Sequence, residues 1–453
     1  MKHLSPVFVS LILAFTCLYT TPAQTAPFQD GETVVFLGDS ITHGRQYHSF
    51  IYDYYLTRYP DRKIHFVNAG ISGDSAGGAM RRLEDDVISK SPTTVVVMLG
   101  MNDVGRSNYV ADPTEKQLEA QAGSLERYEA NMDALLDRIS KETEAKFILL
   151  TPTPFDQTAE IERENQPGCN DGLAKCAELV RKLATKYDAQ VIDLHGPMTS
   201  FNLEQQKDDP TYTIVGFDRV HPGIPGNVMM AWLFLKGQDA PATVSHIEFD
   251  AEANKFPGTK NASVSNLQIT EDSRTFSVEE DALPWPIHAE GSELLTKLPI
   301  IEDLNQQIIQ IKNLKSGNYT LTIDGETAAT HSAEEWAEGI NLATIPTTPQ
   351  SIQATEVAKI NEKRRSAETR LRGYACVRWF LGRYIDPDDF EAINEFMKSK
   401  EGETGYYLSK VPTYLAEWEN RGEVEAMVLK LEKDAQEAAK PVPRIYKLTK
   451  SQN

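Results

Sequence analysis

The chain has 453 residues and carries 46 Lys and Arg against 66 Asp and Glu, which gives a net charge of -20 at pH 7. This length exceeds the usual single domain of about 100 to 200 residues, so two or three domains are expected. The acidic surplus repels polyphosphates and argues against nucleic acid as the main partner.

Residues 1–26 are typical of an export signal. An apolar run from Val7 to Leu18 follows a weakly basic start and leads to the small-residue sequence Thr21-Pro22-Ala23. The run is shorter than the roughly 20 apolar residues of a membrane span. We therefore expect cleavage near Ala23 or Ala26, a secreted or periplasmic location, and no membrane span in the mature chain.

Residues 27–240 have the pattern of an α/β domain. Short β-branched apolar runs alternate with helix-like stretches, which predicts repeated βαβ units and a parallel sheet. The expected strands are 33–37, 63–67, 94–99, 146–150 and 190–194. Helices are expected between the strands, among them 128–140, 173–187 and a closing helix at 226–235.

The character of the chain changes after about residue 240. Alternating apolar segments at 244–249, 307–311 and 319–323 predict a small β-rich appendage over 241–331. From residue 332 to 453 the composition becomes helical and highly charged. Candidate helices in this C-terminal region are 352–371, 388–397 and 414–439.

The first candidate for chemistry is Ser40. Gly38-Asp39-Ser40 follows the first expected strand directly, so Ser40 would lie at the carboxyl end of the strand, where the sheet binds ligands. The start of the next helix offers unpaired N–H groups and a positive dipole to a developing oxyanion. A Gly-Asp-Ser turn that only caps a helix would give the same pattern.

The second candidate is the pair Asp218 and His221, near the end of the α/β region. Their three-residue spacing places both side chains on one turn. A carboxylate there can bind Nδ1 of the imidazole and leave Nε2 to take a proton from a serine hydroxyl. An Asp at a helix start beside an incidental His would look the same.

The third candidate is Asn102, in the segment Gly100-Met101-Asn102-Asp103 after the strand that ends at Leu99. Its amide would lie at the same sheet edge as Ser40 and could donate to an oxyanion. Loss of one such donor costs about 100- to 1000-fold in rate. A simple turn after a strand is the alternative.

Together, four separated blocks resemble those of the SGNH (GDSL) hydrolase family: Gly38-Asp39-Ser40, Asn68 to Gly73, Gly100 to Asp103 and Asp218 to His221. The resemblance covers about residues 32–238. It implies a three-layer flavodoxin-like α/β sandwich with about five parallel strands. It also implies Ser40 as nucleophile, His221 as general base and Asp218 as its orienting partner. Ser40, Gly73 and Asn102 would form the oxyanion hole, with no metal and no cofactor.

Ser75 is a rival nucleophile, because Gly73 to Gly77 matches the G-x-S-x-G elbow of α/β hydrolases. Against it, the elbow would follow only the second strand, and no oxyanion-forming HGGG-type loop precedes it. A glycine at position 73 also suits an oxyanion turn, since substrate can approach the backbone closely. The chain order Ser, Asp, His fits both serines, and we prefer Ser40.

Removal of the signal leaves Cys169, Cys176 and Cys376, too few for a disulfide scaffold. Cys169 and Cys176 could close one short loop or remain unpaired, and the sequence leaves both open. The cysteines and histidines lack the spacing of a zinc site.

The expected activity is hydrolysis of a small ester through an acyl-enzyme, with an O-acetyl group on a polysaccharide as the expected substrate. Lipase and thioesterase activities occur in the same family, and the fold does not choose among them. An alternative of another class is an extracellular carbohydrate- or partner-binding protein whose hydrolase domain is idle.

Overall fold

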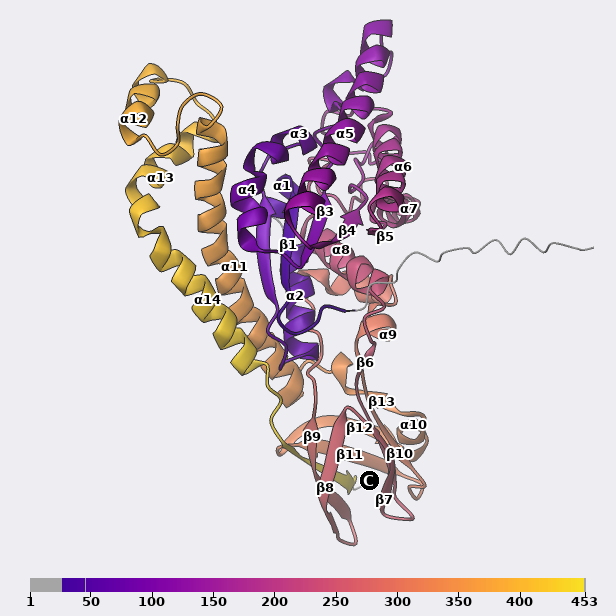
Figure 1. Cartoon of the computed structure of the whole chain (residues 1–453). Helices are drawn as coiled ribbons and strands as arrows, with labels where there is room; N and C mark the ends of the chain where they lie inside the picture. Colours follow the sequence, from indigo (N-terminus) through magenta and orange to yellow (C-terminus); the bar gives the residue numbers. More distant parts are fainter. Residues whose placement is uncertain (1–26, 45, 452–453) are drawn as a thin grey trace, which may run out of the picture.

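The computed structural model describes residues 27–44 and 46–451, so the expected export signal lies outside the described residues. Figure 1 shows three parts: an α/β domain, a β-sandwich below it and a helical arm along one flank. Among the described helices, none is long and apolar enough to cross a membrane.

The α/β domain is built on a five-stranded parallel sheet, as the sequence predicts. Its strands are β1 (Thr33–Gly38), β2 (His65–Gly70), β3 (Thr94–Met98), β4 (Lys146–Leu150) and β5 (Gln190–Ile192), in the order β2-β1-β3-β4-β5. β2 runs three residues further than expected. Its polar and small end, Asn68 to Gly70, has no strand pattern but continues the parallel register beside Phe36 to Gly38.

Helices cover both faces of this sheet and make the three layers. Alternate residues of β1 enter two separate cores: Val34 and Phe36 pack with α2 (Tyr47–Arg58) and α8 (Ile224–Gly237). Val35 and Leu37 pack with α5 (Glu115–Glu142) and α6 (Cys169–Lys186). The shorter helices of the domain are α1 (Ser40–Gly44), α3 (Ala76–Ala79), α4 (Leu83–Asp86) and α7 (His195–Gln205).

Helix α5 begins well before the expected range 128–140. A capping box between Thr114 and Gln117 starts it, and its buried residues begin only at Ser124. The first part therefore projects beyond the sheet, as Figure 1 shows, and lacks the apolar period by which a helix is recognised in sequence.

The β-sandwich consists of two sheets that enclose their own core. One has the order β13-β10-β6-β7 and the other β12-β11-β14-β9-β8. The strands are β6 (Thr243–Asp250), β7 (Lys255–Lys260), β8 (Ala262–Ile269), β9 (Ser273–Glu280), β10 (Gln306–Lys312), β11 (Asn318–Ile323), β12 (Glu326–Ser332), β13 (Ile340–Asn341) and β14 (Arg444–Lys450), with helices α9 (Ile300–Leu304) and α10 (Ala333–Glu338).

The C-terminal region, expected to be helical from 332 to 453, contains strand β14. This strand lies in the middle of its sheet, antiparallel to both β9 and β11. Its buried Tyr446 and Leu448 alternate with more exposed residues, a period of two that seven residues at the end of a helical region do not make conspicuous. The chain therefore leaves the sandwich after β13 and returns to it at β14.

Between these strands the chain forms the helical arm, residues 349–438. Its helices are α11 (Pro349–Leu381), α12 (Phe390–Ser399), α13 (Val411–Glu417) and α14 (Arg421–Ala438). In Figure 1, α11 and α14 lie side by side along the flank of the α/β domain, and α12 and α13 form the tip.

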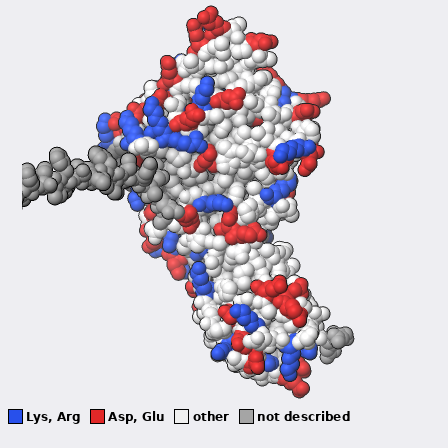
Figure 2. Space-filling model, turned by 90° about the vertical axis from the view of Figure 1, so that its right-hand side faces the viewer, with Lys and Arg blue, Asp and Glu red and all other residues white. Residues whose placement is uncertain are grey.

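Figure 2 shows acidic and basic side chains interspersed over the face of the molecule that is turned toward the viewer.

Candidate active site

Three side chains predicted from sequence meet at the carboxyl edge of the sheet. β1 ends at Gly38, and Ser40 is the first residue of α1. Ser40 Oγ lies 2.7 Å from His221 Nε2, and His221 Nδ1 lies 2.5 Å from Asp218 Oδ2. The three form one continuous hydrogen-bonded chain, in the order hydroxyl, imidazole, carboxylate.

The turn that carries Asp218 and His221 is held by its own carboxylate. Asp218 Oδ1 accepts the backbone N–H groups of His221 at 2.8 Å and Val220 at 3.1 Å. Partial burial alone raises the pKa of Asp218, but these bonds and the one from the imidazole outweigh it and hold the pKa well below its usual value. Asp218 therefore remains ionised at neutral pH, where it can orient the imidazole and stabilise its protonated form.

The candidate oxyanion groups lie on neighbouring loops. Gly73 has a left-handed backbone with φ of +72°, which favours glycine. Asn102 Nδ2 donates to the carbonyl oxygen of Asp74 at 2.8 Å, so the loop after β3 is tied to the loop that carries Gly73. Near Ser40, Asp39 Oδ1 accepts the N–H of Ile41 at 2.9 Å and fixes the turn into α1.

Ser75 has a different place. It is the N-cap of α3, where its Oγ accepts the N–H of Gly78 at 3.2 Å. The next N–H, from Ala76, is accepted by Asp103 Oδ1 at 2.9 Å. The structure thus brings Ser40 to His221, while the hydroxyl of Ser75 serves the start of a helix.

Comparison with known proteins identifies the family of the chain. Residues 36–227 match the model of the GDSL-like lipase/acylhydrolase family. A solved structure of a gut microbial diltiazem-metabolizing enzyme is 30% identical, with a TM-score of 0.88, and the alignment covers 95% of this chain and 100% of that chain. The chain belongs to the GDSL-like lipase/acylhydrolase family.

A second similar protein matches less than half of this chain. The acetylxylan esterase of Geobacillus stearothermophilus is 28% identical over 221 residues, which are 46% of this chain and 93% of that protein. Its crystal structure is 26% identical, with a TM-score of 0.37, and covers 46% of this chain and 95% of that one. The diltiazem-metabolizing enzyme, in contrast, is similar over the sandwich and the arm as well.

A buried charge network that the sequence did not reveal lies beneath the Gly73 loop of this GDSL domain. Arg82 Nε donates to Asp74 Oδ2 and Arg82 Nη1 to Asp86 Oδ2, each at 2.7 Å. The same guanidinium donates to the carbonyl oxygens of Ala69 at 2.7 Å and Gly38 at 3.1 Å. One side chain therefore ties together the ends of β1 and β2 and the loop that follows β2.

A second residue missed in the sequence, Arg219, fixes the turn between Asp218 and His221. Arg219 is buried, and its φ of +66° is unusual for a residue with a side chain. Its guanidinium donates to the carbonyl oxygens of Asp156 at 2.9 Å and Ala159 at 3.0 Å. An arginine between an Asp and a His carries no sequence signal for this role, because its partners lie some 60 residues earlier.

The three cysteines of the described chain, Cys169, Cys176 and Cys376, are buried and unpaired. Cys169 and Cys176 lie on α6 as separate thiols, which answers the question that the sequence left open. Burial raises the pKa of Cys169 to about 12, so this thiol stays protonated. Within the described ranges, no group of three or more His, Cys, Asp or Glu is placed to hold a metal ion.

Proposed function

We propose that this protein is an exported serine esterase that removes small acyl groups, with O-acetyl groups on carbohydrate as its natural substrates. The observation that carries the proposal is the hydrogen-bonded chain from Ser40 Oγ through His221 to Asp218. A serine hydroxyl is a weak nucleophile, and an adjacent, oriented imidazole is the group that activates it.

In the proposed reaction, Ser40 Oγ attacks the ester carbonyl carbon while His221 Nε2 takes the hydroxyl proton. The carbonyl oxygen becomes an oxyanion that the N–H groups of Ser40 and Gly73 and the amide of Asn102 stabilise. When the tetrahedral intermediate collapses, the ester C–O bond breaks and His221 gives its proton to the leaving alcohol. Water, deprotonated by His221, then attacks the acyl-enzyme; as the bond from the acyl carbon to Ser40 Oγ breaks, His221 returns the proton to Oγ, and the acid and free Ser40 are released.

Two observations support a carbohydrate ester. A stretch of 221 residues of this chain is 28% identical to a protein named acetylxylan esterase and spans 93% of that protein. Phe217, the residue before Asp218, has 78% of its surface exposed, and an apolar ring beside the triad can lie against the face of a sugar ring. Export, which the sequence of residues 1–26 predicts, would bring the protein to extracellular or periplasmic polysaccharides.

The test is a kinetic comparison of the wild type with Ser40→Ala and Ser75→Ala, each shown to be folded by circular dichroism. We expect Ser40→Ala to lower the hydrolysis of 4-nitrophenyl acetate by about 10⁴-fold or more. Ser75→Ala should lose less than about tenfold, since it loses only a helix cap. Loss of activity in Ser75→Ala alone would contradict the assignment of the nucleophile.

The substrate class needs its own assay. We expect acetate release from acetylated xylo-oligosaccharides to be faster than hydrolysis of 4-nitrophenyl octanoate or of an acyl thioester. A preference for the long acyl chain would favour a lipase, and a preference for the thioester would favour a thioesterase. If the protein is inactive on all these esters but is retained on insoluble polysaccharide, it is a binding protein with an idle hydrolase domain.

A further inference from the structure

The helical arm covers the open edge of the hydrolase sheet. Strand β2 is an edge strand, so its outward N–H and C=O groups need partners. Glu368 Oε1 on α11 accepts the N–H of Asn68 at 2.8 Å, and Arg372 donates from Nη2 and Nε to the carbonyl oxygen of Gly70 at 3.1 and 3.2 Å. Side chains four residues apart on one helix therefore replace a neighbouring strand.

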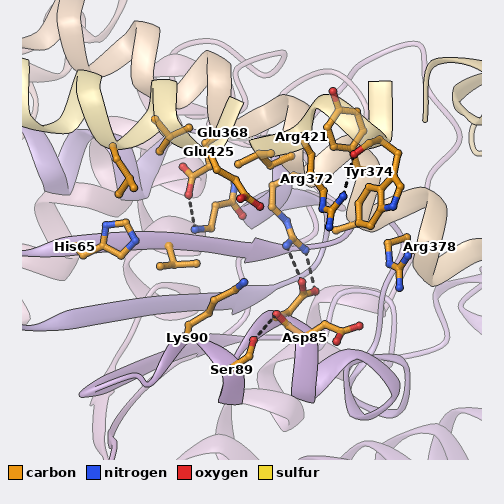
Figure 3. Close-up of a pocket in the computed structure, with 18 residues that line it drawn as sticks. His65, Asp85, Ser89, Lys90, Glu368, Arg372, Tyr374, Arg378, Arg421 and Glu425 are labelled. Atoms are coloured by element: carbon orange, nitrogen blue, oxygen red, sulfur yellow. Dashed lines mark hydrogen bonds and ion pairs between the residues drawn. The ribbon is translucent and has the colours of Figure 1, made fainter. Parts of the chain in front are cut away.

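Arg372 is anchored on both sides. Besides Gly70, it binds both carboxylate oxygens of Asp86, at 2.8 and 3.0 Å. Figure 3 shows Arg372 at the wall of a pocket of about 600 Å³ between the arm and the hydrolase domain, and Asp86 also lines this pocket. The contact joins α11 to the same carboxylate that Arg82 holds beneath the Gly73 loop.

One turn further along α11, the arm reaches His43 of α1, which in turn contacts Ser72, just after β2. Cys376 Sγ lies 3.5 Å from Nδ1 of His43, and this nitrogen accepts the N–H of Ser72 at 3.2 Å. Burial lowers the pKa of His43 to about 3, so the ring is neutral and its Nδ1 can act as acceptor. The N–H side of Ser72 is thereby fixed by the hydrolase domain.

The carbonyl side of Ser72 is fixed by the arm. The hydroxyl of Tyr407, in the segment before α13, donates to the carbonyl oxygen of Ser72. The ring of Tyr407 is stacked on Phe380 at 5.3 Å between centroids and 11° between planes, at the end of α11. Tyr407 is close to Gly73 too, since its hydroxyl lies 3.5 Å from the position that a Cβ on Gly73 would occupy.

The carbonyl group of Ser72 and the N–H group of Gly73 belong to one peptide unit. A hydrogen bond to the carbonyl oxygen keeps that unit from rotating and polarises it, so that its N–H becomes a better donor. Oxyanion stabilisation depends on donors that are already oriented when charge develops. The contact from Tyr407 thus acts on the group that the proposed mechanism needs at Gly73.

We propose that the arm contributes to catalysis. Tyr407 is a positioning residue that orients the Ser72–Gly73 peptide so that the N–H of Gly73 can donate to the oxyanion. The inference rests on the proposed esterase function. It assigns to residues more than 300 positions away from Ser72 an effect on the chemical step itself, whereas a purely structural arm would affect only stability.

The decisive variant is Tyr407→Phe, which keeps the stacked ring and removes the hydroxyl. Tyr406→Phe is the matched control, because Tyr406 is 52% exposed and its ring lies against Lys410. For Tyr407→Phe we expect kcat on 4-nitrophenyl acetate to fall about 10- to 100-fold, a smaller factor than the removal of a direct oxyanion donor causes. KM should stay within about twofold of the wild-type value. Phosphorylation of the enzyme by diethyl 4-nitrophenyl phosphate should slow by a similar factor, since it also develops an oxyanion. Tyr406→Phe should match the wild type in both assays.

Phe380→Leu provides a second variant. It removes the ring that orients Tyr407 but leaves the hydroxyl, and we expect a smaller fall in kcat in the same direction. The inference is overturned if the wild type is active and folded Tyr407→Phe has the same kcat within about twofold. It is also overturned if both variants lose only stability. A wild type that hydrolyses no ester removes the proposed function and the inference together, so the two failures are distinguishable.

Discussion

Replacement of Arg372 by methionine should measure how strongly the arm is held to the hydrolase domain. Methionine keeps most of the length of the side chain and removes the guanidinium. Arg372 and Asp86 are each 8% exposed as side chains, so the variant removes a buried ion pair with two hydrogen bonds and leaves Gly70 without its donors.

The expected cost follows from these contacts. Breaking a buried ion pair by removing one partner costs about 3 to 5 kcal/mol. Since Asp86 keeps Arg82 as a second partner, we expect about 3 kcal/mol, at the lower end of that range. The loss should appear as a lower midpoint in guanidinium chloride unfolding, followed by tryptophan fluorescence.

Arg370→Met is the matched control on the same helix. Arg370 pairs with Glu417 at 3.1 Å, but the two side chains are 50% and 37% exposed, so its loss should cost less than about 1 kcal/mol. If Arg372→Met costs no more than Arg370→Met, the arm is not held by the contacts described here, and the reasoning about the β2 edge is refuted.

Three further substitutions test separate parts of the account. Phe217→Ala should raise KM for acetylated xylo-oligosaccharides about fivefold, because it removes a contact with the sugar ring worth about 1 kcal/mol. KM for 4-nitrophenyl acetate should stay unchanged. Gly216→Ala should lower kcat/KM about 100-fold, because φ there is +78° and the new Cβ would lie 2.6 Å from the carbonyl oxygen of His221; an unchanged kcat/KM would contradict this. Burial raises the pKa of Asp53 from 3.8 to about 7, so its contribution to stability is complete below about pH 4 and is lost as the pH rises through about 7. Asp53→Asn can still accept a hydrogen bond from the side-chain amide of Asn361. It should remove up to about 4 kcal/mol of this decline in chemical unfolding at pH 4 to 8, and parallel pH profiles of the variant and the wild type would speak against it.

The parallel sheet and the meeting of Ser40, Asp218 and His221 could be predicted because their signals are local. β1, β3 and β4 are short apolar runs, and each is followed by the residues that it presents at the carboxyl edge of the sheet. Ser40 and Asn102 therefore followed from strand ends, and Asp218 with His221 from their spacing. Four such blocks in one order carry far more information than any of them alone.

The contacts of the arm could not be predicted, because they join residues far apart in the chain. Tyr407 and Ser72 are 335 positions apart, and Arg372 and Gly70 are 302 apart. On α11, Arg372 is one of many charged residues, and burial alone distinguishes it from Arg370. Strand β14 was missed for a related reason, since its place between β9 and β11 is fixed by pairing with residues more than 100 positions earlier.

The most direct test of the central claim is to identify which side chain reacts as a nucleophile. Diethyl 4-nitrophenyl phosphate phosphorylates an activated serine and releases 4-nitrophenolate, and peptide mass spectrometry then locates the diethylphosphoryl group. The account predicts one group per chain, on Ser40, with loss of esterase activity in step with labelling. Asp218→Asn should be labelled more slowly than the wild type. A label on Ser75, or an active esterase that remains unlabelled at Ser40, would contradict it.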